Sequence, residues 1–464
     1  MRTLFKGGSV VSGKGARRAD LLVEGEKVVS MGRGLKAEAD RTVDVTGCVL
    51  FPGFIDAHTH FDLEVAGTVT ADGFASGSRA ALRGGTTTVI DFACPDKGES
   101  LASGLERWRK KAGGQTFCDY GFHMTIDDWN EHVRQELPEM FFQGISSFKM
   151  YMTYPAMLLG DRDLYWALKE LKTLGGVCGV HCENAGVIDG MIAEKKALGE
   201  LSPASHPQTR PPYLEAEAVG RLLRIAQAAQ APVIIVHLTN GEALSEVTHA
   251  RKRGQTVYVE TCPQYLTLDE SLYFQEDFSQ AARYVCAPPL RARREQDVLW
   301  KALRRGEIQT VSTDHCSFTL EQKAMGREDF TKIPGGLPGV ETRGELLWSC
   351  GVAKRKLSVA QMCRVLSENP AKLYGLFPRK GTLQPGSDAD IVVYDPSGGH
   401  VIRAEDCVSA AGYSPYEGFA TDGGIRQVWL RGRLAAENGN VLETDPRGRY
   451  MARGKCSLLF SREK

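Results

Sequence analysis

The central part of the chain alternates short, continuously apolar runs with longer amphipathic segments. Eight apolar runs are typical of buried strands, and they cover residues 54–57, 87–91, 120–124, 147–150, 177–181, 233–237, 257–261 and 310–314. Between them, segments such as Arg162–Leu171 and Glu215–Leu223 carry apolar residues at helical spacing. Continuously apolar strands that alternate with helices indicate a parallel sheet covered by helices, and eight such strands favour a closed (β/α)₈ barrel over an open sheet.

Both ends of the chain show a different pattern, in which short β-type runs are separated by glycine-rich turns. Residues 21–23, 43–45, 390–394 and 428–431 are the clearest runs. We therefore expect an α/β protein with a (β/α)₈ barrel over residues 53–385 and a small β-sandwich domain formed by residues 1–52 and 386–464. Two separate β appendages are the alternative. From about Arg447 onward, we expect a tail that packs on a neighbour or stays mobile.

Composition narrows the class of protein. The 464 residues fit a barrel with an appended domain. Lysine plus arginine and aspartate plus glutamate number 57 each, and this formal charge of zero argues against nucleic acid or an anionic membrane as the main partner. We see no apolar stretch of membrane-spanning length and no signal peptide. Twelve cysteines without a Cys-x-x-Cys pair favour reduced thiols, so we expect a cytoplasmic protein.

Side chains that can bind a metal gather at the carboxyl ends of the predicted strands. They are His58 and His60 after the first strand, Lys149 on the fourth, His181 at the end of the fifth, His237 at the end of the sixth and Asp314 at the end of the eighth. Residues i and i+2 of an extended chain point to the same side, so the two histidines of the first strand can face one point. Neutral imidazoles are good ligands for zinc and similar ions.

Each of these residues alone has a structural explanation. An isolated His-x-His pair is a weak signal, and a single histidine such as His181 is more often a core residue than a ligand. Asp314 could cap a helix, and Lys149 could pair with a carboxylate. Their joint position at barrel-strand ends is harder to explain in this way, because the carboxyl ends of barrel strands meet at the mouth, where active sites of this fold lie.

The chemistry of such a set points to two metal ions. Four imidazoles and one carboxylate exceed what a single catalytic zinc uses while it keeps an open position. Two ions would share them, and an anion should bridge the pair. If its pKa is lowered, the amine of Lys149 can react with carbon dioxide to give a carboxylate-like carbamate. A bridging hydroxide would then be the nucleophile, with Asp314 placed to accept its proton.

Nine motifs between about Leu4 and Arg449 carry a resemblance to a known family. They are Gly53–His60 (Gly-Phe-Ile-Asp-Ala-His-Thr-His), Gly84–Thr88, Ser147–Tyr154, Val180–Asn184, Val236–Asn240, Glu260–Tyr265, Ala287–Arg291, Thr313–Cys316 and Gly336–Glu341. With them the chain resembles the cyclic amidohydrolases of the dihydropyrimidinase and hydantoinase group, within the amidohydrolase superfamily. The resemblance is greatest to the bacterial phenylhydantoinase-like branch.

The resemblance implies a barrel with a β-sandwich built from both chain ends, usually in a homotetramer. It implies two zinc ions bridged by carboxylated Lys149, the first bound by His58, His60 and Asp314 and the second by His181 and His237. Tyr154 matches the tyrosine that hydrogen-bonds the substrate as oxyanion charge develops. Backbone groups at Ala287 and Gly335 match two further substrate contacts, at positions where the family more often has serine and asparagine.

The implied reaction opens the cyclic amide bond of dihydropyrimidines or 5-substituted hydantoins to give N-carbamoyl amino acids. The partner is then a small cyclic imide or ureide, whose ring substituent we expect to face Leu63 and Val65. Dihydroorotases resemble this group but place an arginine two residues after His-x-His, where this chain has Asp62. Allantoinase-like chains usually carry an Asn-Glu-Pro-Gly run there, and this chain reads Phe61–Glu64. Dihydropyrimidinase-related scaffold proteins have lost metal ligands, whereas this chain keeps all six.

Other conspicuous residues favour structural interpretations. Cys182, Cys286 and Cys316 lie near the expected site, but the ligand set is full without them, and we expect them to pack as small apolar groups. His123 ends the third predicted strand without matching a ligand of the family. His315 is a candidate partner behind the metal ligands.

Overall fold

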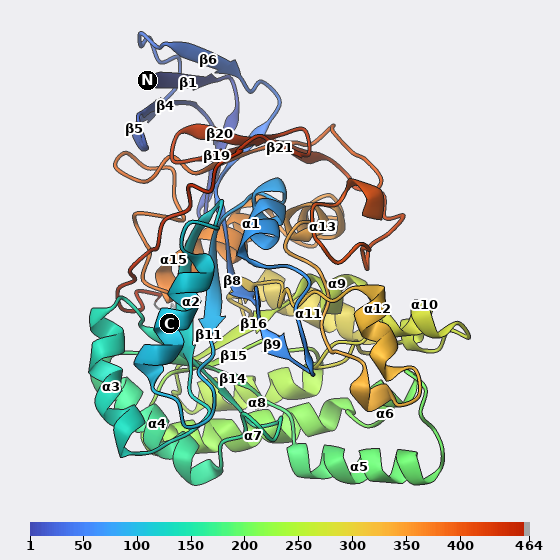
Figure 1. Cartoon of the computed structure of the whole chain (residues 1–464). Helices are drawn as coiled ribbons and strands as arrows, with labels where there is room; N and C mark the ends of the chain where they lie inside the picture. Colours follow the sequence, from blue (N-terminus) through green and yellow to red (C-terminus); the bar gives the residue numbers. More distant parts are fainter. Residues whose placement is uncertain (459–464) are drawn as a thin grey trace.

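A closed sheet of eight parallel strands forms the centre of the molecule in this computed structural model, which describes residues 1–458 (Figure 1). The barrel strands are β8 (Phe54–Thr59), β11 (Thr86–Ala93), β12 (Asp119–Thr125), β13 (Ser147–Tyr151), β14 (Val177–His181), β15 (Val233–Ile235), β16 (Val257–Thr261) and β17 (Thr310–Val311). Each strand pairs with its neighbour in chain order, and a parallel bridge joins Thr59 of the first strand to His315, which follows the last strand by four residues. The predicted (β/α)₈ barrel is confirmed.

Two barrel strands are shorter than the apolar pattern predicts. The runs 233–237 and 310–314 were expected to be strands throughout, but β15 ends at Ile235 and β17 ends at Val311. His237 has φ of 39° and Asp314 has φ of 52°, which lie outside the strand region. The chain therefore leaves the sheet just before these two residues, a turn that an apolar pattern does not record.

Helices follow the strands and cover the barrel. The longer ones are α1 (Phe74–Arg83), α2 (Leu101–Ala112), α3 (Glu131–Phe142), α4 (Asp161–Leu174), α5 (Ala185–Ala197), α7 (Pro212–Ala229), α8 (Gly241–Lys252) and α11 (Arg294–Arg305). Shorter ones are α6 (Ser205–Gln208), α9 (Pro263–Thr267), α10 (Phe278–Ala282), α12 (Leu320–Lys323), α13 (Arg343–Leu347), α14 (Val359–Cys363) and α15 (Asn369–Leu373). The two helices that the sequence predicts most clearly lie within α4 and α7.

Strands from both ends of the chain build two further sheets beside the barrel. A seven-stranded sheet joins β21 (Asn440–Val441), β20 (Arg433–Glu437), β19 (Gly424–Leu430), β18 (Ile391–Asp395), β7 (Val49–Pro52), β2 (Ser9–Ser12) and β3 (Gly15–Arg18) in that order. A four-stranded sheet joins β5 (Lys27–Gly32), β4 (Asp20–Glu24), β1 (Arg2–Lys6) and β6 (Arg41–Asp44). Phe5 and Trp429 pack edge-to-face at 5.0 Å in their shared core, so the two ends fold together and are not separate appendages.

The described part of the C-terminal tail packs on its own barrel. Met451 N donates to Tyr120 O, and Arg453 N donates to Gly144 O. Arg453 is buried, and its guanidinium donates to Ser147 Oγ at 2.7 Å. The tail up to residue 458 packs on its own barrel, so the alternative that it stays mobile is wrong there, whereas packing on a neighbouring chain stays a prediction.

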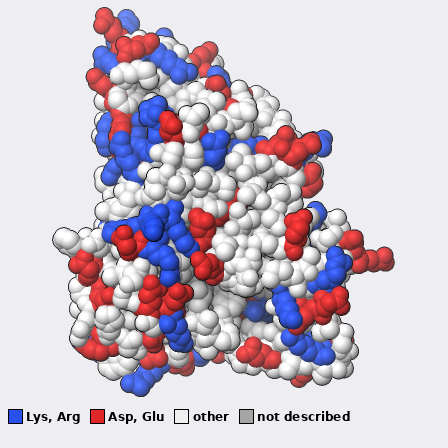
Figure 2. All heavy atoms as spheres, viewed as in Figure 1, with Lys and Arg blue, Asp and Glu red and all other residues white. Residues whose placement is uncertain are grey.

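The surface carries no single dominant sign of charge on the face shown in Figure 2, where basic and acidic side chains are interspersed. All twelve cysteines are free thiols. Among the described residues, no helix combines the length and the apolar character needed to span a bilayer.

Candidate active site

His58 lies at the centre of a group of side chains at the carboxyl ends of the barrel strands. It belongs to β8, a strand buried along its whole length, and its ring is 1% exposed. Its Nδ1 atom lies 2.6 Å from Glu260 Oε1, and its Nε2 atom lies 3.2 Å from Asp314 Oδ1. The hydrogen bond to the carboxylate places the proton on Nδ1 and leaves the Nε2 lone pair free for a metal.

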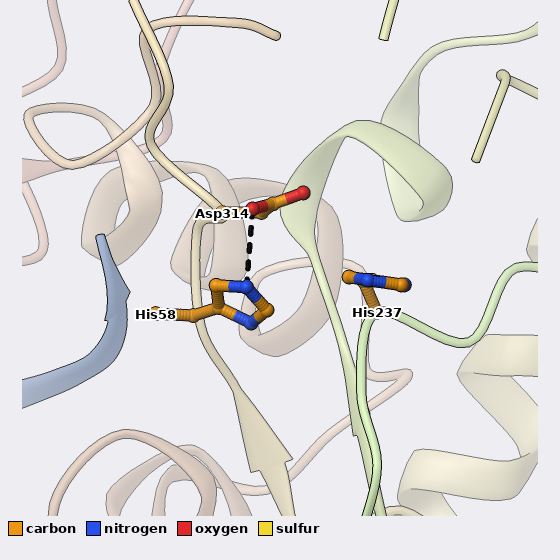
Figure 3. A group of neighbouring side chains, drawn as sticks. All are labelled: His58, His237 and Asp314. Carbon is orange, nitrogen blue, oxygen red and sulfur yellow. Dashed lines mark ion pairs between the residues drawn. The ribbon is translucent and has the colours of Figure 1, made fainter. Parts of the chain in front are cut away.

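Three of the predicted ligands converge on a single point. One ligand atom each from His58, His237 and Asp314 lies within 4.8 Å of the other two. Figure 3 shows the two imidazoles and the carboxylate, which come from three different segments of the chain. This group can hold a metal ion.

The other three predicted ligands border the same group. His60 Nε2 lies 3.1 Å from Asp314 Oδ1. The ring of His181 lies 4.5 Å from the ring of His237. Lys149 lies on β13, is 1% exposed and places Nζ 3.4 Å from His58 Nε2. The structure thus brings all six residues together at the mouth of the barrel.

Burial sets the charges in this group. It lowers the pKa of His58 and His237 well below the ordinary value of 6.5, and it lowers the pKa of His181 as well. These imidazoles are therefore neutral at pH 7, the state that binds metals. Burial also lowers the pKa of Lys149, which favours the neutral amine that carbamate formation needs.

A metal fits this set of donors. His60 Nδ1 and His237 Nδ1 are buried and have no hydrogen-bond partner among the described residues, so these two nitrogen atoms are not used by the protein's own hydrogen bonds. The imidazoles, the carboxylate of Asp314 and the amine of Lys149 lie in contact with one another at one point. Together they supply the nitrogen and oxygen atoms that a divalent metal ion needs as ligands.

Similarity to known proteins agrees with this geometry. Residues 49–435 match the amidohydrolase family. The D-hydantoinase of Geobacillus stearothermophilus is 42% identical over 99% of this chain and 98% of its own length, and a D-phenylhydantoinase of Escherichia coli is 41% identical over 98% of each. The crystal structure of dihydropyrimidinase from Brevibacillus agri superposes with a TM-score of 0.97 at 42% identity, over 99% of this chain and 100% of that one.

The chain belongs to the amidohydrolase family. The resemblance predicted from its motifs, to cyclic amidohydrolases of the hydantoinase and dihydropyrimidinase group, is confirmed by these relatives.

Two buried glutamates behind the histidines of this amidohydrolase were not predicted. Glu260 is the penultimate residue of β16 and lies beside His58, and burial raises its pKa to about 7. Glu183 Oε2 accepts a hydrogen bond from His181 Nε2 at 2.7 Å and another from Arg210 at 2.8 Å. Metal-binding histidines commonly donate their second N–H to a carboxylate in this way, which fixes the ring. In the sequence, Glu260 lies inside a buried strand and Glu183 follows His181 by two residues, and neither position by itself indicates a partner for a histidine.

Tyr154 lies at the edge of the group. It has φ of 66°, its ring lies 5.1 Å from the ring of His181, and the guanidinium of Arg210 lies 6.0 Å from the Tyr154 ring centre. Burial raises the pKa of Tyr154, so the phenol keeps its proton and remains a hydrogen-bond donor.

Ala287 and Gly335 lie next to each other in two facing loops. A Cβ atom placed on Gly335 would lie 3.8 Å from Ala287 N. Ala287 is half-buried and Gly335 is exposed. In the described part of the chain, neither residue has a hydrogen bond to its backbone groups, which are therefore free to bind a ligand.

The loop after β8 carries Asp62, Leu63 and Val65, and Leu63 does not lie where we expected it. Asp62 accepts a hydrogen bond from Phe74 N at the start of α1, at 2.9 Å, so its carboxylate is engaged there. Leu63 is buried in the main hydrophobic core, while Val65 is half-buried on β9 (Glu64–Val65). Leu63 therefore has little exposed surface to offer a ring substituent, and a contact of Val65 with the substituent stays a prediction.

The residues expected to be structural lie outside the ligand group. His123 Nε2 and Nδ1 are occupied by Ala57 O at 2.9 Å and Ser147 Oγ at 2.6 Å. His315 Nε2 lies 3.0 Å from Asp72 Oδ2, and its Nδ1 accepts from backbone N–H groups of the next loop. His315 therefore anchors the segment that carries Asp314. Cys182, Cys286 and Cys316 are buried, and burial raises their thiol pKa values.

Proposed function

We propose that this amidohydrolase opens the cyclic amide bond of dihydropyrimidines or 5-substituted hydantoins and releases N-carbamoyl amino acids. The observation that carries the proposal is the convergence of His58, His237 and Asp314 at the barrel mouth, in a chain about two-fifths identical to proteins named D-hydantoinase and D-phenylhydantoinase. An alternative within the same class is an allantoinase- or dihydroorotase-like activity.

The proposed cofactor is a pair of divalent metal ions, with zinc as the first choice. His58, His60 and Asp314 would hold one ion and His181 and His237 the other, with Lys149 between them as a carbamate. When bound, such a pair polarises a carbonyl and brings the pKa of water close to neutrality. The lowered pKa of Lys149 supports the carbamate, because only the neutral amine reacts with carbon dioxide.

The proposed proton carrier is Asp314. Burial raises its pKa, but the neighbouring His58 and His60 outweigh burial and hold the pKa well below the ordinary value, so the carboxylate is ionised. Its side chain is 15% exposed, which leaves it open to the mouth. Asp314 would accept a proton from the attacking water and deliver it to the leaving ring nitrogen.

The proposed substrate contacts recognise a neutral ring. Tyr154 would donate a hydrogen bond from its hydroxyl to the carbonyl oxygen of the ring amide as negative charge develops there. The free backbone groups of Ala287 and Gly335 would bind the cyclic –CO–NH–CO– edge. Asp62 occupies the position of the dihydroorotase arginine, so this position offers no cation to a substrate carboxylate. The Asp62 carboxylate is engaged by a hydrogen bond from the start of α1, so it would repel an anionic substituent only weakly. An anionic substituent is disfavoured mainly because no cation is present at this position to bind it.

Three finer points belong to the same proposal. The chain would act in the cytoplasm as a homotetramer. Its domains would divide into a barrel of residues 53–385 and a sandwich of residues 1–52 and 386–464, since β7 from the first sandwich segment pairs with β18 from the second.

A comparison of substrates tests the proposal. Purified protein with its metals would be assayed for kcat/KM on phenylhydantoin, dihydrouracil, allantoin and dihydroorotate, with the N-carbamoyl product identified by mass spectrometry. We expect phenylhydantoin or dihydrouracil to be opened fastest, and Asp314→Asn to abolish the activity. Asp395→Asn makes the same change on β18 and serves as the control. A higher kcat/KM for dihydroorotate, or no opening of any imide, would contradict the proposal.

A further inference from the structure

A buried lysine outside the ligand group joins the two loops that carry Ala287 and Gly335. Lys323 ends α12 and is 1% exposed. Its ammonium donates to three backbone carbonyl oxygens: Val285 O at 2.7 Å, Pro334 O at 2.6 Å and Gly336 O at 2.8 Å. One side chain therefore bonds both loops at once.

In the loop around Ala287, side chains donate hydrogen bonds to the carbonyl groups of the neighbouring residues but not to that of Ala287 itself. Besides Val285 O, the carbonyl of Cys286 is bonded by His206 Nε2 at 2.8 Å, and the carbonyl of Pro288 is bonded by the Tyr265 hydroxyl at 2.8 Å. The carbonyls before and after Ala287 are thus held by side chains, and only that of Ala287 is free within the described residues.

The second loop repeats this pattern. Lys323 bonds the carbonyls of Pro334 and Gly336, and Gly336 N donates to Val285 O at 3.0 Å in the first loop. Gly335, between the two bonded carbonyls, keeps its own carbonyl and N–H free in the described chain. Pro334 and Gly336 are buried, whereas Gly335 is exposed. The loops therefore present one free residue each, with fixed neighbours.

We propose that Lys323 is a positioning residue that holds these two loops so that the free backbone groups of Ala287 and Gly335 bind the imide edge of the substrate together. The inference rests on the proposed function for the identity of the ligand. It concerns the binding of the substrate and not the chemical step, because Lys323 does not touch the metal ligands.

A buried lysine is an unusual choice if the loops need only a filled space. Enclosing an ammonium group costs free energy, and burial accordingly lowers the pKa of Lys323 to about 7. The three short carbonyl contacts accept from the charged form and must offset this cost. A methionine of similar length would fill the space without that cost. The ammonium group adds directional hydrogen bonds. Its three N–H groups fix the positions of three carbonyl groups, from two loops, relative to one another. This is useful where both loops contact one small rigid ligand.

Two variants separate the positioning role from general stability. Lys323→Met keeps the length of the side chain and removes all three donors, while Lys323→Gln keeps two N–H donors and can restore part of the contact. Val247→Ala, on α8 in the hydrophobic core, is the control for a loss of stability away from the mouth. Each variant would be assayed on phenylhydantoin and dihydrouracil, with metal content measured in parallel.

We expect Lys323→Met to lower kcat/KM about 10- to 100-fold, mainly through a higher KM with metal content unchanged. Lys323→Gln should lie between Lys323→Met and the wild type, and Val247→Ala should keep the wild-type KM. Hydrogen exchange at residues 284–290 and 332–338 should accelerate in Lys323→Met. If Lys323→Met does not fold, the KM of Lys323→Gln decides.

The inference is overturned if either Lys323 variant folds and keeps the wild-type KM, or if hydrogen exchange in both loops is unchanged. If the wild type opens no cyclic imide, the proposed function fails on its own. The exchange measurement, which needs no substrate, then decides whether Lys323 holds the loops, so the two failures remain distinguishable.

Discussion

At pH 8, above the Glu260 pKa of about 7, removing the charge of Glu260 should weaken metal binding without changing the ligands. Glu260 is completely buried and its Oε1 atom lies 2.6 Å from His58 Nδ1. In Glu260→Gln the amide oxygen can still accept the hydrogen bond from His58 Nδ1, but this bond is no longer charge-assisted. Hydrogen bonds to charged groups contribute about 1.5–3 kcal/mol and neutral ones about 0.5–1.5 kcal/mol. The difference of about 1–1.5 kcal/mol predicts a loss of about tenfold in metal affinity.

Glu260→Ala removes the hydrogen-bond partner of His58 altogether and should lower the zinc affinity by up to about 100-fold, since the His58 ring is then free to rotate or to change tautomer. Metal-free protein, prepared with a chelator, would be titrated with zinc in a metal buffer, and the bound metal per chain and the Kd would be measured. Glu345→Gln makes the same change at a buried carboxylate that contacts Ile425 N, away from the site. Equal zinc affinity for wild type, Glu260→Gln and Glu260→Ala would refute the role assigned to Glu260.

Three further outcomes are expected. Elemental analysis of the purified protein should give close to two metal ions per chain, as six ligand-type side chains require. Lys149→Ala should lose most of the activity and part of the bound metal, and short carboxylic acids should restore some of both by replacing the bridge. Burial raises the pKa of Asp127 from 3.8 to about 6, so stability should fall as pH rises through this interval, where the folded state holds more protons. Asp127→Asn should therefore raise the free energy of unfolding by about 1–3 kcal/mol at pH 8 and have little effect near pH 4.

Each of these outcomes has a result that contradicts it. Protein without metal that also stays inactive after metal is added would remove the basis for a dinuclear site. Full activity of Lys149→Ala would exclude the carbamate, and Lys169→Ala, at a surface lysine of α4, controls for the loss of a lysine elsewhere. Denaturant unfolding at pH 4 and pH 8 decides the case of Asp127, since an equal shift at both values would show that its ionisation is not the cause.

The fold was predictable from the sequence because each barrel strand and the helix after it have their own local hydrophobic pattern. A strand buried on both faces, such as β15 with Val233, Ile234 and Ile235, is apolar over its whole length, and the helix that follows must be apolar on one face only. The order of strands then follows from the short connections between neighbours. The limits of the prediction lie at His237 and Asp314, whose positive φ values depend on contacts made by the finished barrel.

The site was predictable only for residues whose chemistry is conspicuous at a strand end. His58, His181 and Asp314 stand out because ligand-type side chains are rare at the end of an apolar run. The carboxylate of Glu260 and the ammonium of Lys323 have equally specific contacts, but a glutamate and a lysine are the residues that a reader of sequence assigns to the surface.

Nothing local distinguishes these two residues from their exposed counterparts. Lys323 bonds to carbonyls 38 and 13 residues away in the chain, and Glu260 meets a histidine 202 residues away. Side chains that position others are defined by such long-range contacts, whereas the groups they position are defined by their own chemistry. The supporting residues of an active site therefore become visible only when the chain is folded, and they are where the structure adds most to the functional hypothesis.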